Sequence, residues 1–314
     1  MPKRRIPRPV LVVHGGAGTV APEHRAAAVA GTREAARVGR DILLAGGSCE
    51  DAVVAAIRVL EDDPAFNAGR GACMNRDGQF ELDAGLMRSC DRRSGAVAGV
   101  RDVRDPILLA RLVLERTPHC LVVGQGAEAL GRAHGVGSFG RDEVWTAKAE
   151  AAFAAVREGR AGADNRADTV GAVALDLAGN FCAGGSTGGI LYKMPGRVGD
   201  TPMLGAGFYA NPEWGACATT GVGEVLLTHL VAYHGLSAAQ NADRETSDGG
   251  VRRWLEEIAR KSDGAALGLI LVRADGESMV VHASEHMSWA RADGDAPIVG
   301  GLTRRDALAP EESF

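Results

Sequence analysis

The dipeptide Asp168-Thr169, in the middle of the chain, places a threonine hydroxyl where the cutting of one peptide bond would activate it. A threonine hydroxyl is a poor nucleophile until a base lies beside it. Cleavage between Asp168 and Thr169 would create a free α-amino group, whose ordinary pKa is roughly 7.7 to 8, next to the Thr169 hydroxyl. One residue would then supply both the nucleophile and the base.

The residues on either side of Thr169 fit such a cut. Residues 159–168 are small and polar, which indicates a flexible linker, and the small apolar residues from Val170 onward indicate a buried strand. A threonine that opens a strand is commonly structural, because β-branched residues favour strands. The hypothesis that Thr169 is a nucleophile therefore depends on residues further along the chain.

Two opposite charges lie three residues apart in the turn Gly196-Arg-Val-Gly-Asp200. The planar guanidinium of Arg197 can bind a carboxylate through two hydrogen bonds, and Asp200 can bind an ammonium group. Together they predict a clamp for the charged end of an amino acid. The alternative interpretation is an ordinary surface ion pair.

A third segment, Thr219-Thr-Gly-Val-Gly-Glu224, opens an expected helix. The Thr220 hydroxyl and the N–H of Gly221 can donate hydrogen bonds to a developing oxyanion. The alternative is a glycine-rich turn without a catalytic role. A further glycine-rich segment, Gly184-Gly-Ser-Thr-Gly-Gly189, ends the strand that follows the Thr169 strand.

Other motifs follow one another in the first part of the chain: Val12-Val-His-Gly-Gly-Ala-Gly18, Phe66-Asn-Ala-Gly-Arg-Gly71, Glu81-Leu-Asp-Ala84, Gly95-Ala-Val-Ala-Gly-Val100, and Pro118-His119 followed by Val122-Val-Gly124. With the segments described above, they resemble the plant-type L-asparaginase/isoaspartyl peptidase family of N-terminal-nucleophile hydrolases, which is related to glycosylasparaginase. Several motifs in order are far more specific than any one of them. The resemblance covers nearly the whole chain.

The resemblance implies a role for each residue that matches a family motif. The implied roles are nucleophile for Thr169, nucleophile-holding threonine for Thr187, oxyanion donors for Thr220 and Gly221, carboxylate and amine anchors for Arg197 and Asp200, amine contact for Gly223, and polar neighbour of the nucleophile for Asn67. The segment Leu60-Glu-Asp-Asp-Pro-Ala-Phe66 is similar to a loop that binds sodium in the family. The implied ligands are the backbone carbonyls of Leu60, Glu61, Asp63 and Phe66.

The resemblance also implies the fold and the activity. The expected fold is α+β, a four-layer αββα sandwich formed by a single domain of residues 1–314. Cleavage would divide this domain into residues 1–168, which end in the linker 159–168, and residues 169–314. The expected enzyme cuts itself, hydrolyses L-asparagine and β-aspartyl dipeptides, needs no organic cofactor and forms a homodimer of cleaved units.

Two positions depart from the family pattern. Asp168 stands where asparaginases of this type commonly have glycine, and Asp-Thr is more similar to glycosylasparaginase. Because Asp168 is on the leaving side of the cut, we expect it to affect the cleavage rate more than substrate choice. Val222 stands between glycines where a polar residue is frequent.

Three other hypotheses deserve comparison. Gly184-Gly-Ser186-Thr-Gly188 fits the G-x-S-x-G elbow of esterases, with His14-Gly-Gly-Ala as an oxyanion loop and Asp248 and His282 as triad partners. However, Ile-Leu-Tyr-Lys-Met-Pro follows Gly189, and this is no convincing helix. The segment His282-Ala-Ser-Glu285-His286 fits a zinc pattern, but the residues before it indicate a strand rather than the required helix. A phosphate-binding module is the alternative without catalysis, although no P-loop or Rossmann fingerprint is present.

The amino-acid composition is typical of an ordinary soluble enzyme. The chain has 314 residues, 46% of them hydrophobic, and a net charge of -5, which argues against nucleic-acid partners. The basic residues near the start, Lys3-Arg-Arg5 and Arg8, lack the apolar segment of a signal peptide, and no apolar run is long enough for a membrane span. The six cysteines lack CxxC spacing, so we expect buried thiols in a reducing compartment, by default the cytoplasm.

The hydrophobic pattern predicts the elements that must position these residues. Helices are expected at residues 23–45, 49–61, 106–116, 142–157, 225–233 and 252–260, with Ser48 capping the second and Pro106 beginning the third. Strands are expected at 10–13, 267–272 and 279–282, the last two joined at Gly276, together with a hairpin that turns at Gly179-Asn180. Strands grouped apart from helices favour layered α+β packing over alternating βαβ units.

Overall fold

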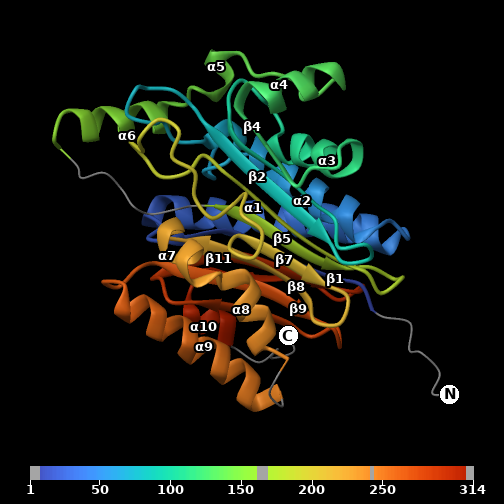
Figure 1. The fold of residues 1–314 in the computed structure, drawn as a ribbon. Helices are drawn as coiled ribbons and strands as arrows, with labels where there is room; N and C mark the ends of the chain where they lie inside the picture. The colour runs from blue at the N-terminus through green and yellow to red at the C-terminus, as the bar shows by residue number, and fades with distance from the viewer. Residues whose placement is uncertain (1–7, 161–168, 241–243, 309–314) are drawn as a thin grey trace.

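The computed structural model describes residues 8–160, 169–240 and 244–308, and two β-sheets form its centre (Figure 1). The larger sheet has the strand order β12-β11-β1-β5-β6-β2-β3-β4, and the smaller sheet has the order β10-β9-β8-β7. The strands of the larger sheet are β1 (Val10–Gly18), β2 (Leu82–Arg88), β3 (Ser94–Val100), β4 (Leu121–Val123), β5 (Val170–Leu175), β6 (Phe181–Thr187), β11 (His286–Asp293) and β12 (Val299–Gly301). Those of the smaller sheet are β7 (Phe208–Asn211), β8 (Gly215–Gly221), β9 (Leu267–Arg273) and β10 (Ser278–His282).

Helices cover the outer faces of the two sheets (Figure 1). The helices α1, α2 and α3 pack on the larger sheet, whereas α8 and α9 pack on the smaller one. The helix bounds are α1 (Pro22–Leu44), α2 (Cys49–Asp62), α3 (Pro106–Arg116), α4 (Gly124–Ala133), α5 (Arg141–Val144), α6 (Ala147–Arg157), α7 (Gly223–His229), α8 (Val231–Ala238), α9 (Arg244–Lys261) and α10 (Arg304–Leu308), with a short 3₁₀ turn η1 (Gly69–Gly71). The structure is therefore a mixed α/β protein in which two sheets lie face to face.

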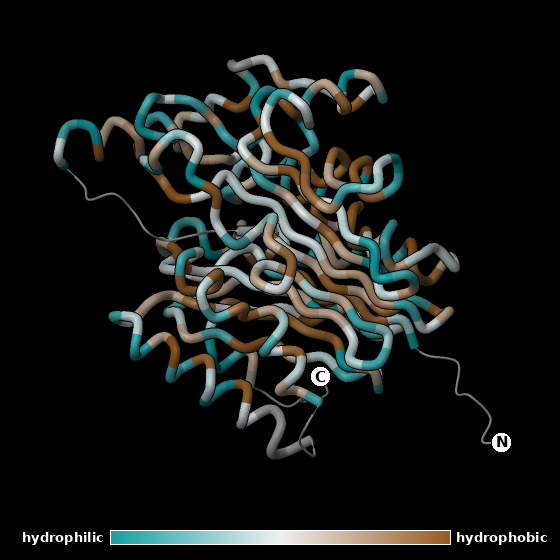
Figure 2. Tube along the Cα trace, in the orientation of Figure 1, coloured by the Kyte–Doolittle hydropathy of each residue, from teal (hydrophilic) through white to brown (hydrophobic). Residues whose placement is uncertain are grey.

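Two hydrophobic cores follow from this layering. One lies between the larger sheet and the helices α1 to α3, and the other lies between the two sheets and beneath α8 and α9. Figure 2 shows the hydrophobic residues concentrated along the central strands and the helix faces turned toward them. Because successive side chains of a strand point to opposite faces, the strands β1, β2, β3, β5, β6 and β11 supply residues to both cores.

The hairpin of β5 and β6 shows this alternation clearly. Val173 of β5 belongs to the core between the sheets, whereas Ala172 and Ala174 belong to the core beneath the helices. In β6, Cys182 faces the helices and Ala183 faces the smaller sheet. By the same period of two, Thr169 and Thr187 lie on the face toward the smaller sheet.

Several expected elements agree with the structure. The helices α1, α2 and α3 begin and end within one or two residues of the expected bounds, and the Ser48 side chain accepts a hydrogen bond from the Asp51 N–H at the start of α2. The hairpin of β5 and β6 turns at Gly179, which has a φ of +85°. Gly276, with a φ of +87°, marks the turn between β9 and β10.

Two expected helices were wrong in their continuity. The helix expected at 142–157 is divided into α5 and α6, because Thr146 takes an extended conformation and its side chain caps α6 by accepting from the Ala149 N–H. The helix expected at 225–233 is divided into α7 and α8 at Leu230, which adopts the left-handed conformation with a φ of +45°. Strand β1 and helix α9 are longer than expected. The elements that were not predicted are the strands β2, β3, β4, β7, β8, β11 and β12 and the helices α4 and α10.

The cysteines agree only in part with the expectation of buried thiols. All six are free, and three of them are buried, but Cys90 and Cys120 are exposed and Cys73 is half-buried. Within the described ranges, none of the helices combines the length and hydropathy needed to cross a membrane.

Candidate active site

Three threonine hydroxyls meet at the start of β5. Thr169 directly precedes the strand, and its Oγ1 lies 3.3 Å from Oγ1 of Thr187 and 3.4 Å from Oγ1 of Thr201. All three side chains are buried. Residues 161–168 of the expected linker, which include Asp168, lie outside the described residues. The structure therefore describes only the Thr169 side of the expected cleavage site.

Strand register explains why Thr169 and Thr187 meet. In the β5·β6 ladder Val170 is opposite Ser186. Thr169, just before Val170, and Thr187, just after Ser186, are therefore neighbours on the same face of the sheet. Gly185, two residues before Thr187, lies on that face as well. A Cβ atom at Gly185 would lie 3.4 Å from the Thr201 methyl and 3.9 Å from the Thr169 methyl, so this glycine forms the floor beneath both side chains.

Asn67 holds the chain that follows Thr187. The side-chain Nδ2 of Asn67 donates to the Gly189 carbonyl at 2.6 Å, and the backbone carbonyl of Asn67 accepts from the Gly188 N–H at 2.9 Å. The Gly189 N–H in turn donates to Thr187 Oγ1 at 2.9 Å. Asn67 therefore acts on the Thr187 hydroxyl through the backbone of residues 188 and 189.

The expected clamp residues converge at the start of α7, but they do not form a direct ion pair with each other. Arg197 instead binds the Glu224 carboxylate through Nε at 3.0 Å and Nη2 at 2.9 Å. A Cβ atom at Gly223 would lie 2.7 Å from Arg197 Nη2 and 3.0 Å from Asp200 Oδ1. Gly223 therefore has no room for a side chain, and its backbone lies directly against both the guanidinium and the carboxylate of the expected clamp.

The electrostatics of Asp200 are unusual for a surface turn. Its side chain is only 2% exposed, and burial raises its pKa to about 7. The charge of Arg197 and a hydrogen bond from Thr219 Oγ1 at 3.4 Å oppose this rise. A buried carboxylate with too few partners gains from a bound ammonium group, which is the use expected for Asp200.

Thr220 and Gly221 end strand β8 of the smaller sheet. The Thr220 hydroxyl accepts from the Ala17 N–H at 3.2 Å, which links the end of β8 to the Val12–Gly18 motif in β1. Gly221 is opposite Leu267 in the β8·β9 ladder. Thr219, which directly precedes Thr220, donates to the Asp200 carboxylate at 3.4 Å. The expected oxyanion donors therefore follow directly in the chain after a residue that contacts the clamp.

The end of α2 presents backbone carbonyls that have lost their usual helical donors. The residue four positions after Leu60 is Pro64, which has no N–H, and the N–H of Ala65, four positions after Glu61, donates to Asp63 Oδ1 at 2.9 Å. The Asp63 carbonyl accepts from the Phe66 N–H at 3.2 Å. Carbonyl oxygens at a helix C-terminus suit a hard cation such as sodium.

The structure contradicts the esterase arrangement. Ser186 faces the helices rather than the smaller sheet, where it lies beside the buried Glu61 carboxyl, and it is therefore on the opposite face from Thr169. His282 ends β10, and its Nδ1 contacts Ser284 at 3.1 Å. His14 is fully buried in β1, where burial lowers its pKa to about 3.

The zinc hypothesis also fails on geometry. His282 ends β10 and His286 begins β11, so the segment is not helical and its histidines do not share a helix face. In the part of the chain that the structure describes, the His, Cys, Asp and Glu side chains form no group able to hold a metal ion.

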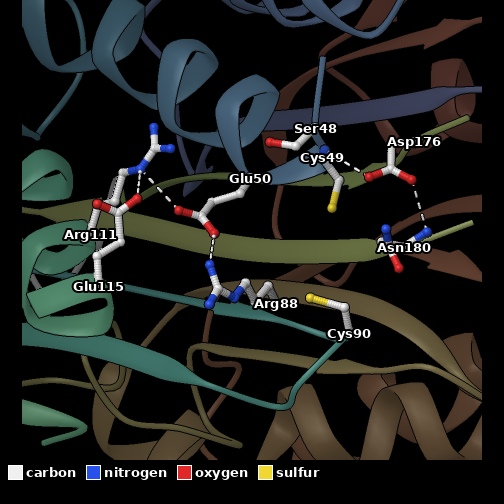
Figure 3. Close-up of a pocket in the computed structure, with 9 residues that line it drawn as sticks. All are labelled: Ser48, Cys49, Glu50, Arg88, Cys90, Arg111, Glu115, Asp176 and Asn180. Atoms are coloured by element: carbon white, nitrogen blue, oxygen red, sulfur yellow. Dashed lines mark hydrogen bonds and ion pairs between the residues drawn. The ribbon is translucent and has the colours of Figure 1, made fainter. Parts of the chain in front are cut away.

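A separate cavity of about 210 Å³ lies at the hairpin end of β5 and β6, opposite to the end that carries Thr169 and Thr187 (Figure 3). Its arginines are already paired: Arg88 binds Glu50 at 2.9 Å and Asp91 at 2.8 Å, and Arg111 binds Glu50 at 2.9 Å. The charges of Arg88 and Arg111 are balanced within the protein, as the charge of Arg197 is by Glu224, but this cavity lies at the other end of β5 and β6 from Thr169 and so does not hold a substrate beside its hydroxyl.

Two residues at the site were not predicted from the sequence. Thr201 directly follows the predicted anchor Asp200, and Glu224 directly follows Gly223, but neither stands out by residue type. The signal that was available for Thr201 is its place before Pro202, because a residue before proline has a restricted backbone conformation. Glu224 could have been paired with Arg197 only by knowing that the turn and α7 meet.

Comparison with known proteins gives the family. The model of the asparaginase family matches residues 7–299, and the chain belongs to this family. Isoaspartyl peptidase/L-asparaginase of Bos taurus is 40% identical over 298 residues, which cover 90% of this chain and 93% of the relative. The Homo sapiens protein of the same name is 40% identical, and the match covers 90% of this chain and 93% of that protein. Isoaspartyl peptidase of Salmonella typhimurium is also 40% identical, and the match covers 93% of this chain and 97% of that protein.

Proposed function

We propose that this chain is a self-cleaving threonine amidohydrolase that converts L-asparagine to L-aspartate and ammonia, and β-aspartyl dipeptides to L-aspartate and an amino acid. Membership of the asparaginase family and the names of its relatives support both activities. The observation that carries the assignment of the nucleophile is the position of Thr169. Its buried hydroxyl lies within 3.4 Å of two other hydroxyls at the start of an inner strand.

In the precursor, the Thr169 hydroxyl attacks the carbonyl carbon of Asp168. The peptide bond is replaced by an ester to Thr169 Oγ1, and the former amide nitrogen takes up the proton of the hydroxyl. Water then hydrolyses the ester, which leaves a carboxylate on Asp168 and a free α-amino group on Thr169. A single domain of residues 1–314 is thereby divided into 1–168, with the linker 159–168 at its end, and 169–314.

In the mature enzyme, the free amine of Thr169 removes the proton from its hydroxyl as Oγ1 attacks the side-chain carbonyl of the substrate. Thr220 and Gly221 donate hydrogen bonds to the resulting oxyanion, and Thr187 holds the attacking oxygen. The proton passes from the amine to the departing nitrogen, which leaves as ammonia or as an amino acid. Water then releases L-aspartate from the ester and restores the hydroxyl.

The clamp explains why one site serves two kinds of substrate. Arg197 binds the α-carboxylate, while Asp200 and the backbone at Gly223 bind the α-ammonium group. Both groups belong to the aspartyl portion that the two substrates share. The leaving group lies on the other side of the reacting carbonyl and contacts neither anchor, so it can differ between substrates.

Three further features belong to this proposal. The two sheets with helices on their outer faces form a four-layer αββα sandwich of the N-terminal-nucleophile type. A structural sodium ion, bound by the carbonyls of Leu60, Glu61, Asp63 and Phe66, stabilises the loop that leads to Asn67; no organic cofactor takes part in the reaction. The cleaved units pair as a homodimer.

Intact-mass analysis of the purified protein tests the proposal most directly. We expect two fragments, one that ends at Asp168 and one that begins at Thr169, together with release of ammonia from L-asparagine. A single uncut chain that hydrolyses neither substrate would refute the proposed function and leave a binding module as the better interpretation.

Replacing Arg197 by lysine should weaken substrate binding while self-cleavage continues. Lysine keeps the charge but loses the planar fork that grips Glu224 and a substrate carboxylate. A hydrogen bond to a charged group is worth about 1.5 to 3 kcal/mol, so KM for L-asparagine should rise by roughly 10- to 100-fold. The matched control is Arg88→Lys, which removes a similar fork in the other cavity; steady-state kinetics equal to wild type in Arg197→Lys would place Arg197 outside the site.

Binding of the product L-aspartate should depend on the protonation of Asp200. The folded-state pKa of Asp200 is about 7, so the unliganded site loses its carboxylate as the pH falls through 7. Calorimetric titration should show a Kd for L-aspartate that rises up to about tenfold per pH unit below 7.

The folded-state pKa of Asp200 is raised above its unfolded value, so the ionised carboxylate lowers the free energy of unfolding at pH values above 7. This loss of stability disappears below about pH 4, where the carboxyl group is protonated in both states. Asp200→Asn should therefore raise the melting temperature at pH 8 while it abolishes binding; a lower melting temperature there would contradict this account.

A further inference from the structure

We propose that Thr201 is a positioning residue for the nucleophile, and that it joins the nucleophile to the substrate clamp. This inference rests on the proposed function, because it assumes that Thr169 is the attacking group. Its direct basis is the 3.4 Å separation between the Thr201 and Thr169 hydroxyls, both of which are buried.

The hydrogen-bond directions give Thr201 a distinct role. Thr169 donates its hydroxyl proton to Thr187 Oγ1, which also accepts from the Gly189 N–H. A hydroxyl has only one proton to donate, so in the contact between Thr169 and Thr201 the donor is Thr201. Thr187 accepts a hydrogen bond from the Thr169 hydroxyl, whereas Thr201 donates one to the oxygen that attacks.

A donor at this oxygen helps wherever Oγ1 carries negative charge. Oγ1 gains charge when its proton is removed, and it gains charge again when the ester to the substrate breaks and Oγ1 departs. A fixed donor stabilises both situations and directs the remaining lone pair. The separation of 3.4 Å is long for two hydroxyls, as is common for catalytic contacts before substrate binds.

Packing fixes Thr201 in this place. Its methyl group lies on Gly185, and its Cα would lie 2.8 Å from a Cβ atom at Gly207, so neither neighbour leaves room for it to shift. Pro202 narrows the conformations open to the Thr201 backbone, and the Met203 N–H closes a turn over both residues by donating to the Asp200 carbonyl at 2.8 Å. The hydroxyl is therefore held by a rigid segment rather than by a mobile loop.

The position of Thr201 in the chain couples two functions. Asp200 is the amine anchor, and the Cα atoms of consecutive residues are about 3.8 Å apart. The anchor for the substrate and the donor to the nucleophile are thus joined by a single peptide unit. A substrate held by Asp200 has its reacting carbonyl placed relative to the same backbone that orients Thr169.

The test compares Thr201→Val with Thr201→Ser. Valine keeps the shape and loses the donor, whereas serine keeps the donor. We expect Thr201→Val to lower kcat for L-asparagine about tenfold, the scale of one neutral hydrogen bond, and to leave KM and the Kd for L-aspartate within about twofold of wild type. Thr201→Ser should restore most of kcat. The control is Thr32→Val, because Thr32 is equally buried but bonds only to helix carbonyls in α1.

Each outcome decides the inference. A Thr201→Val protein that stays uncut while Thr201→Ser cuts would support it, because the same oxygen attacks in both reactions. Wild-type kcat in Thr201→Val would overturn it, and so would a loss that serine does not restore. A loss of kcat matched by an equal loss of L-aspartate binding would overturn it in favour of a role in the clamp alone. Failure of the proposed function would instead be seen in the wild-type protein, as an uncut and inactive chain.

Discussion

Replacement of Thr169 by alanine should leave a single full-length chain that hydrolyses neither L-asparagine nor β-aspartyl dipeptides. The Thr169 hydroxyl is the only attacking group in the proposed cleavage, so its removal stops maturation, and without maturation the basic α-amino group never forms. The loss should be complete within detection for both reactions. Intact mass after prolonged incubation measures the first reaction, and ammonia release measures the second.

Thr169→Ser is the matched control because it keeps the attacking oxygen. It should still cut, more slowly, since the lost methyl group fixes the side-chain rotamer above Gly185. Cleavage of Thr169→Ala at the same bond would mean that another protease makes the cut, and the self-cleavage mechanism would then be wrong. A folded, uncut Thr169→Ala protein would also provide the precursor for measurements of substrate binding without turnover.

The sequence predicts the local elements around the site because local rules determine them. The hairpin of β5 and β6 follows from two apolar runs separated by a turn with glycine, and the start of α2 follows from the Ser48 cap. The start of α3 follows from Pro106 at its first position. Each of these features depends on residues only a few positions apart.

Features that depend on distant residues were not predictable in the same way. The contact between Arg197 and Glu224 joins a turn to a helix 27 residues away, and the contact between Thr169 and Thr201 spans 32 residues. Strand β2 was missed because Leu82–Arg88 lies buried on both faces and lacks the alternation that marks a half-exposed strand. Leu230 broke an expected helix by adopting a conformation that its residue type disfavours.

Glycines at this site serve two different purposes, which the sequence alone does not distinguish. Gly185 and Gly223 occupy positions where a Cβ atom would contact functional side chains, so their absence of a side chain forms the site itself. In the sequence they cannot be distinguished from glycines that only permit turns, such as Gly276. The shape of the site therefore becomes visible only when the segments that carry the neighbouring side chains are placed together.

The two neighbours Ser186 and Thr187 should respond in opposite ways to removal of their hydroxyls. Thr187→Val should lower hydrolysis of β-aspartyl dipeptides by about 10²-fold or more, because it removes the group that accepts a hydrogen bond from Thr169 and positions the attacking oxygen. Ser186→Ala should cut itself and retain hydrolysis, because its hydroxyl lies on the other face of β6 beside the buried Glu61. Any effect of Ser186→Ala should be seen in thermal stability, since Glu61 loses a polar neighbour in the core. Aspartate release, intact mass and melting temperature measured on both variants separate these roles. An inactive but folded and cleaved Ser186→Ala protein beside a fully active Thr187→Val protein would remove Thr169 as the nucleophile and restore the esterase interpretation.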